Sequence, residues 1–138
     1  MNLIINTDGA SRGNPGKASY GYIIKDGNGV IHHQEGKTIG ITTNNVAEYS
    51  AVLSALTYIR DHYSKKAPHS ILVVSDSQLI AQQLAGNYKV KNETLKKIYY
   101  NIKELEIELG AVSYKNVPRA ENFIADRLAN QALDNEPT

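Results

Sequence analysis

The chain has 138 residues, of which 41% are hydrophobic and 21% charged, and its formal net charge is +1. This length supports one hydrophobic core and is short for two ordinary domains, so we expect a single domain over residues 1–138 with a frayed tail at 134–138. The absence of cysteine excludes disulfides, thiolate metal sites and a cysteine nucleophile. No apolar run could cross a bilayer and the first residues do not resemble a signal peptide, so we expect no membrane partner and a cytoplasmic location.

The first third of the chain predicts three strands. Residues 2–8 form a mainly apolar run, residues 19–25 form a second, and the turn at 26–29 leads to a weakly alternating third at about 30–40. This turn predicts a hairpin between the second and third strands. Asp8 closes the first run. The segment 9–16 that follows is rich in Gly, Ser, Asn and Pro and predicts a loop whose backbone can approach a ligand closely.

The rest of the chain predicts helices alternating with strands. A helix begins near residues 43–45 with an Asn as N-cap, and residues 65–68 connect it to a buried strand at 71–74. Helices follow at about 77–85 and 92–109, the second between Asn92 and Gly110. A short strand at 111–114 and a helix at 120–133 end the fold.

The order of these elements is β-β-β-α-β-α-α-β-α. Hairpin signals in the first part predict antiparallel pairing, and the later alternation of strands with helices predicts parallel neighbours. We therefore expect an α/β fold with a five-stranded mixed sheet and helices on both faces.

Four acidic residues lie at places where they could meet. Asp8 and Asp76 follow apolar strands, while Glu48 and Asp126 fall on the apolar sides of helices. Converging carboxylates repel one another, more so when buried, and a divalent cation relieves the repulsion. Oxygen ligands favour Mg²⁺ or Mn²⁺ over zinc. The histidines show no ligand spacing and are expected at the surface: His32, His33, His62 and His69. Taken singly, each acid is better explained by a cap or a salt bridge, whereas all four at matching positions favour a metal site.

Four blocks of this sequence resemble the type 1 ribonuclease H family. They are Thr7–Ala10 with Gly13–Gly16, Thr43–Glu48, Ser75–Gln78 and Val117–Ala129. The blocks occur in family order over nearly the whole chain, so together they are specific, whereas one Thr-Asp-Gly would be weak. The resemblance implies a ribonuclease H-like fold and an endonuclease that hydrolyses the RNA strand of RNA/DNA hybrids, leaving 5′-phosphate and 3′-hydroxyl ends.

The resemblance also implies roles for individual residues. Two Mg²⁺ ions, or Mn²⁺ as a substitute, would be held by Asp8, Glu48, Asp76 and Asp126, one activating water and the other stabilising the leaving 3′-oxygen. Short amides suit the reading of the 2′-hydroxyls that distinguish RNA from DNA. The implied substrate-binding residues are Gly9, Ser11, Asn14, Thr43, Asn44, Asn45, Gln78 and Lys91. Capping by Asn44 or Asn45 is compatible with substrate contact, and Lys91 is equally well explained as a solvated lysine.

The sequence departs from the family pattern in two places. Many members carry a histidine in the loop before the last aspartate, but residues 115–120 contain none. Arg119 is the implied auxiliary residue, since a guanidinium can hold a phosphate, although it cannot act as a base. The short connection from Gly86 to Asn92 leaves no room for the basic protrusion of some relatives, so weaker substrate binding is expected.

Alternatives to hybrid cleavage remain open from sequence. The enzyme could also, or instead, cleave double-stranded RNA, which the sequence does not distinguish. A non-catalytic nucleic-acid-binding module on the same fold is less favoured, because degeneration usually removes an acid and all four are present. We expect a monomer whose partner is a nucleic acid.

Overall fold

The computed structural model describes residues 2–63, 68 and 70–136. The predicted connector at 65–68 and His69 therefore lie largely outside the described residues, as does the end of the predicted tail. The elements are β1 (Asn2–Gly13), β2 (Gly16–Asp26), β3 (Ile31–Thr42), α1 (Asn44–His62), β4 (Ser70–Ser75), α2 (Gln78–Leu84), α3 (Glu93–Leu109), β5 (Val112–Asn116), the 3₁₀ helix η1 (Arg119–Asn122) and α4 (Phe123–Asp134). The predicted order of strands and α-helices is confirmed. None of the described helices has the length and apolarity needed to span a membrane.

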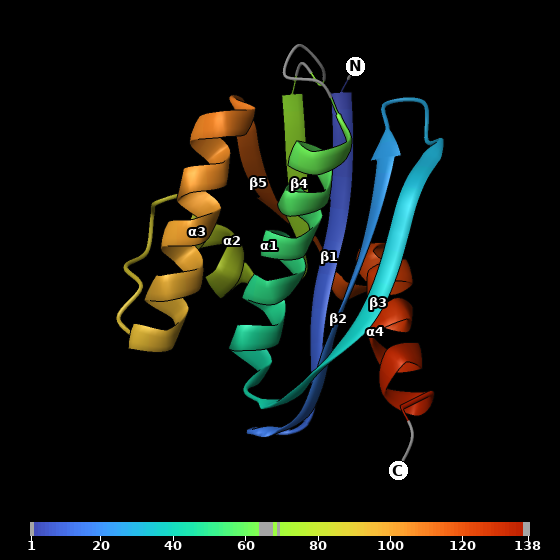
Figure 1. Cartoon of the computed structure of the whole chain (residues 1–138), viewed down its shortest axis with the longest axis vertical. Coiled ribbons are helices and arrows are strands. Elements are labelled where there is room, and N and C mark those ends of the chain that lie inside the picture. The colour runs from blue at the N-terminus through green and yellow to red at the C-terminus, as the bar shows by residue number, and fades with distance from the viewer. Residues whose placement is uncertain (1, 64–67, 69, 137–138) are drawn as a thin grey trace.

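The five strands form one mixed sheet in the order β3-β2-β1-β4-β5. β1 pairs antiparallel with β2, and β2 with β3, whereas β1 and β4, and β4 and β5, are parallel. Helices α1 and α3 lie on one face of this sheet and α4 lies on the other (Figure 1). The predicted α/β fold with a mixed sheet and helices on both faces is therefore confirmed.

Strand β1 is longer than predicted. It continues through residues 9–13, and its antiparallel pairing with β2 runs to the pair Gly13–Gly16. The prediction of a loop over 9–16 is wrong apart from the turn itself, because β2 satisfies the backbone groups of this polar segment. Parallel pairing of β1 with β4 nevertheless stops at Thr7 and Ser75. Asp8 thus lies inside a strand, at the point where its parallel neighbour ends.

Two smaller expectations are corrected. The N-cap of α1 is Thr43, whose hydroxyl accepts a hydrogen bond from the Val46 N–H, and not an Asn. His33 is half-buried, because its ring stacks on Tyr58 with 3.8 Å between ring centroids. The predicted cap of α3 by Asn92 and its termination at Gly110 are confirmed.

The main hydrophobic core lies between the sheet and helices α1 and α3. The fully buried side chains of Val52, Leu56 and Ile59 place one side of α1 against the strands, and Ile102 brings α3 into the same cluster, where α3 packs on α1. Strand β3 is an edge strand with mostly exposed side chains, which explains its weak alternation in sequence. The core therefore holds α1, and with it Glu48, in a fixed place on the sheet.

Candidate active site

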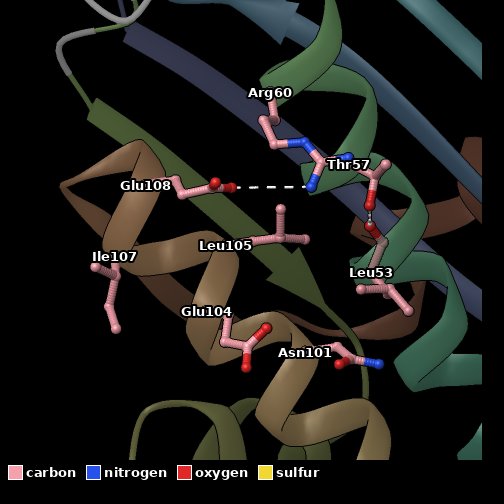
Figure 2. Close-up of a pocket in the computed structure, with 8 residues that line it drawn as sticks. All are labelled: Leu53, Thr57, Arg60, Asn101, Glu104, Leu105, Ile107 and Glu108. Carbon is pink, nitrogen blue, oxygen red and sulfur yellow. Dashed lines mark hydrogen bonds and ion pairs between the residues drawn. The ribbon is translucent and has the colours of Figure 1, made fainter.

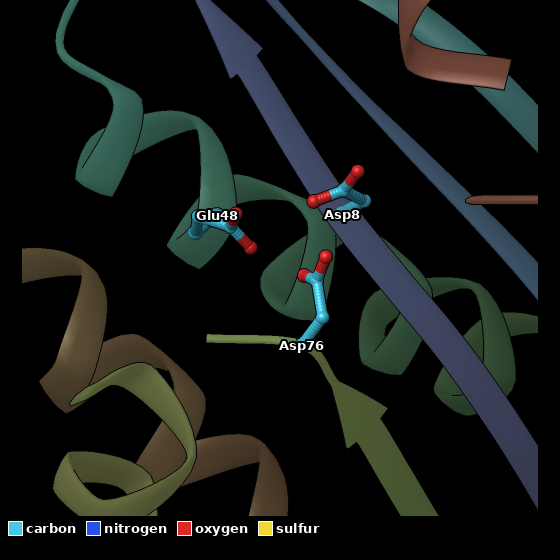
Figure 3. Close-up of side chains that lie close together, drawn as sticks. All are labelled: Asp8, Glu48 and Asp76. Carbon is cyan, nitrogen blue, oxygen red and sulfur yellow. The ribbon is translucent and has the colours of Figure 1, made fainter. Parts of the chain in front are cut away.

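Three acidic side chains from separate elements converge at the end of the parallel pairing. Asp8 comes from β1, Glu48 from the second turn of α1 and Asp76 from the residue after β4. Each offers a carboxylate oxygen, and these three atoms lie within 4.8 Å of one another. Figure 3 shows the three carboxylates turned toward a common point. Asp8 is 4% exposed and Glu48 5%, whereas Asp76 is only partly buried, so the cluster opens to solvent on the Asp76 side.

Gly9 makes this convergence possible. A Cβ atom at this position would lie 2.3 Å from the Glu48 nitrogen, so only glycine lets α1 approach β1 so closely. The Gly9 N–H also donates to Asp8 Oδ1 at 3.0 Å and fixes that carboxylate. On the other side, the Ser77 hydroxyl caps α2 by accepting from the Ile80 N–H, directly after Asp76. Local backbone geometry therefore holds the acids in place.

The three carboxylates are close enough to disfavour one another's ionised form. Burial, together with the charges of Glu48 and Asp76, raises the pKa of Asp8. Burial also raises the pKa of Glu48, with Asp76 contributing. Within the described residues, Glu48 Oε2 is buried without a hydrogen-bond donor. A buried, all-oxygen, donor-poor cluster of this kind fits a divalent cation, which would satisfy these oxygens and compensate their charge.

Asp126 lies in the same hollow but outside the group of three. The hollow has a volume of about 400 Å³ and is lined by Asp8, Gly9, Ala10, Ser11, Asn44, Glu48, Asp76, Ser77, Arg119, Asp126 and Asn130. Arg119 Nη2 lies 3.4 Å from Asp126 Oδ1, and the Arg119 side chain is 77% exposed. Asn130 also donates to Asp126 Oδ1, at 3.3 Å. The four predicted acids thus share one hollow, and within the part of the chain that the structure describes the only basic group lining it is Arg119.

The other residues expected at the site are spread around this hollow. Gly9, Ser11 and Asn44 line it. Asn14 lies next to it, since its Oδ1 accepts from the Asn44 N–H at 3.0 Å. Thr43 and Asn45 flank Asn44 at the start of α1, and Gln78 is exposed at the start of α2.

Lys91 lies apart from the carboxylates. It lines a second hollow of about 580 Å³, together with Lys89, Lys96, Tyr99 and Tyr100 among others. Sequence reasoning did not select Ala10, Ser77 or Asn130 as site residues, although Asn130 follows Asp126 by one helical turn and Ser77 adjoins Asp76. Helical and strand spacing from the chosen acids could have found them.

A third hollow, of about 500 Å³, lies between α1 and α3 (Figure 2). Its charged residues include Arg60 and Glu108, whose Nη1 and Oε2 atoms are 3.8 Å apart. No cluster of metal-type ligands was found there among the described residues. This hollow is larger than the one that holds the carboxylates, but within the described residues it has no comparable cluster of acidic side chains.

Comparison with known proteins agrees with this geometry. Residues 6–132 match the protein-family model described as reverse transcriptase-like. The chain is 40% identical over 136 residues to the bifunctional protein Rv2228c of Mycobacterium tuberculosis, covering 97% of this chain and 36% of that protein. It is 42% identical over 127 residues to ribonuclease HI of Halobacterium salinarum, covering 92% of this chain and 62% of that one.

A solved structure extends the match to three dimensions. LC11-RNase H1, crystallised in complex with an RNA/DNA hybrid, superposes with a TM-score of 0.92 at 41% identity, covering 96% of each chain. The chain therefore belongs to the type 1 ribonuclease H family. It spans only about a third of the length of the mycobacterial relative and under two thirds of that of the halobacterial one.

Proposed function

We propose that this domain is a metal-dependent endoribonuclease that hydrolyses the RNA strand of RNA/DNA hybrids and leaves 5′-phosphate and 3′-hydroxyl ends. The observation that carries the proposal is the meeting of Asp8, Glu48 and Asp76 within 4.8 Å, with Asp126 in the same hollow. Membership of the type 1 ribonuclease H family supports it, as does the hybrid bound to a relative of 41% identity.

The residues of the site fit a divalent cation, and we propose Mg²⁺, with Mn²⁺ as a substitute. Asp8, Glu48, Asp76 and Asp126 would hold two such ions through oxygen atoms alone, the donor set that Mg²⁺ prefers. When bound, the ions supply an activated water and compensate the charge that develops on the scissile phosphate and the leaving oxygen. The unpartnered Glu48 Oε2 supports this assignment, because it is a strong acceptor for which the described residues supply no donor.

The other side chains would bind and orient the substrate. Arg119 is exposed beside Asp126, so its guanidinium can hold a phosphate at the mouth of the hollow without taking a proton. Gly9, Ser11, Asn14, Asn44 and Gln78 are the proposed contacts to the RNA strand, where hydroxyl, amide and backbone groups can pair with 2′-hydroxyls. On the DNA side, the proposed contacts are Thr43 and Asn45, and Lys91 is proposed to meet a phosphate of the hybrid.

A comparison of four substrates tests the proposal. Labelled RNA/DNA hybrid, RNA duplex, DNA duplex and single-stranded RNA are incubated with the protein in Mg²⁺, in Mn²⁺ and in chelator. We expect cleavage of the hybrid with either ion and none in chelator. Cleavage of the RNA duplex as well would extend the substrate range. Binding of hybrid without cleavage under any ion would indicate a non-catalytic module and contradict the proposal.

Asp8→Asn separates chemistry from folding. We expect this variant to lose cleavage and to stay folded, with equal or slightly higher stability in chelator, because it removes one of the repelling charges. The matched control is Asp61→Asn at the exposed end of α1, which should cleave like the parent. Marked unfolding of Asp8→Asn would instead identify Asp8 as a structural acid. A cytoplasmic, monomeric enzyme completes the proposal, and sedimentation tests its oligomeric state.

A further inference from the structure

A group of buried polar side chains lies directly behind the carboxylates. It consists of Asn6, Thr7 and Asn122, which are 8%, 0% and 2% exposed, and we call it the Thr7 hub. Thr7 Oγ1 donates to the Val74 carbonyl at 3.2 Å. Asn122 Nδ2 donates to the Thr7 carbonyl at 2.8 Å, and Asn6 Nδ2 donates to Asn122 Oδ1 at 3.0 Å. One residue of β1 is thereby tied to β4 and to the start of α4.

Each end of the hub lies close in sequence to one of the acids. Thr7 immediately precedes Asp8, and Val74 precedes Asp76 by two residues. Asn122 lies one helical turn before Asp126 and three residues after Arg119. The three hydrogen bonds therefore join the backbone segments that carry Asp8, Asp76 and Asp126. Glu48 is held separately, through the close approach of α1 to Gly9.

The direction of these hydrogen bonds fixes the orientation of both amides. The Thr7 carbonyl can only accept, so Asn122 must turn its Nδ2 toward β1 and its Oδ1 away. Asn6 must then present its own Nδ2 to Asn122. This leaves Asn6 Oδ1 buried without a donor within the described residues. A buried acceptor without a donor lowers folding stability. We therefore infer that the role of Asn6 is to orient Asn122 and not to stabilise the fold.

We propose that Thr7, Asn122 and Asn6 are positioning residues that set the separation of Asp8, Asp76 and Asp126, and through it the affinity of the site for divalent cations. This inference rests on the proposed metal-dependent function. Residues that do not touch a metal but orient its ligands commonly change metal affinity by one to two orders of magnitude when substituted. Repelling carboxylates need such support most, because their mutual repulsion pushes them apart when no ion is present.

Two substitutions test the hub without changing any acid. Thr7→Val removes the hydroxyl donor with little change in shape, and Asn6→Leu removes both the amide donor and the unpartnered acceptor. Mg²⁺ and Mn²⁺ affinities are measured by calorimetry without substrate, and thermal unfolding is followed in chelator. We expect both variants to bind the ions about tenfold more weakly. Asn6→Leu should melt close to the parent, because it exchanges one buried unpartnered acceptor, Asn6 Oδ1, for another, Asn122 Oδ1. Raised Mg²⁺ should restore its hybrid cleavage.

The control is Thr57→Val in α1, where the lost hydroxyl also donates to a main-chain carbonyl, that of Leu53, remote from the acids. It should leave ion affinity unchanged. The inference is overturned if Thr7→Val and Asn6→Leu lower the melting temperature while their ion affinities stay within about twofold of the parent. A parent that binds ions through Asp8 yet cleaves no hybrid would refute the proposed function and leave the hub standing. A parent that binds no divalent ion would refute both.

Discussion

The two faces of the sheet are built in different ways. On the α1 and α3 face, large side chains such as Leu56, Ile59 and Ile102 are fully buried in one continuous cluster. On the α4 face, the helix lies close to the strands over Gly21 and Gly36, where a Cβ atom would come within 2.4 Å of α4 carbonyls. Apart from the close approach of α1 at Gly9, the first face resembles an ordinary hydrophobic core, while the second is mainly a contact of backbone against backbone.

The site draws its acids from both faces. Glu48 comes from α1, which is anchored by the large core, and Asp126 comes from α4, which is anchored by close packing and by polar tethers. One such tether is the Ser19 hydroxyl, which donates to the Ala129 carbonyl at 2.6 Å. Apolar burial tolerates small shifts better than a backbone contact or a hydrogen bond does. We conclude that the first face mainly supplies stability and the second mainly supplies position.

Leu56→Ala should give the largest loss of stability. It removes a fully buried side chain from the large core, and such changes lower the free energy of unfolding by about 2–5 kcal/mol. Because Leu56 is remote from the carboxylates, cleavage per folded molecule should be unchanged at low temperature. Urea unfolding and a cleavage assay measure the two effects. Ile107→Ala, at an 84% exposed position of α3, is the control and should change stability by less than about 0.5 kcal/mol.

Gly21→Ala tests the opposite face. The new Cβ would lie 2.4 Å from the Ala125 carbonyl oxygen and 2.7 Å from the Ala129 nitrogen, so α4 must move. We expect stability to fall by about 1–3 kcal/mol. Unlike Leu56→Ala, this change should also lower cleavage per folded molecule, because α4 carries Asp126. Gly27→Ala is a matched control, since nothing lies within 4 Å of its Cβ position. Full activity in folded Gly21→Ala would contradict the conclusion that packing on the α4 face positions the acids.

The crowded carboxylates of the site should make the free energy of unfolding depend on pH when no metal is present. Burial and neighbouring acids raise the pKa values of Asp8 and Glu48 above their ordinary 3.8 and 4.5. The folded state then holds protons that the unfolded chain has lost, so stability is greatest below about pH 4 and falls as pH rises through the raised values. For one retained proton, the fall from pH 5.5 to 7.0 is about 2 kcal/mol.

Unfolding in chelator at several pH values measures this slope. Asp8→Asn should flatten it, and Mg²⁺ should reverse it by binding the ionised acids. Stability that rises from pH 5.5 to 7.0 in chelator would show that the acids are not crowded in the folded protein.

Much of this architecture was predictable because it follows from local pattern. The helical spacing of Val52, Leu56 and Ile59 and the apolar run at 71–74 each reflect burial of one element against the sheet, so they are visible in sequence. The caps at Asn92 and Gly110 are equally local. Asp8 and Asp76 could be brought together by inference, since parallel neighbouring strands expose their ends at the same edge.

What the sequence did not reveal depends on contacts distant along the chain. Residues 9–13 have the composition of a loop, and only pairing with β2 keeps them in a strand. Asn6, within an apolar run, gives no sign that it faces Asn122, 116 residues away. The unequal placement of Asp126 relative to the other acids likewise results from how α4 packs, which no spacing in the sequence encodes. The catalytic and substrate-binding roles of individual residues stay predictions.

The smallest expected effect concerns the outer rim of the α1 face. The Tyr58 ring lies between two histidines, 3.8 Å from the His33 centroid at an interplanar angle of 2° and 3.9 Å from that of His62 at 15°. His33 is on edge strand β3, so this stack links the exposed edge of the sheet to α1. Tyr58→Leu keeps an apolar side chain but loses the stacking, and we expect a loss of about 0.5–1.5 kcal/mol in urea unfolding.

Tyr88→Leu is the control for this last change, because among the described residues its ring stacks on no other aromatic side chain. Hydrogen exchange should also report faster opening of β3 in Tyr58→Leu than in Tyr88→Leu. Equal losses of stability in the two variants, with equal hydrogen-exchange protection of β3, would mean that only the buried core of the α1 face stabilises the fold. If Tyr58→Leu alone loosens β3, that role extends to the edge strand, because the stack then adds to the contacts that β3 makes with β2 and α4.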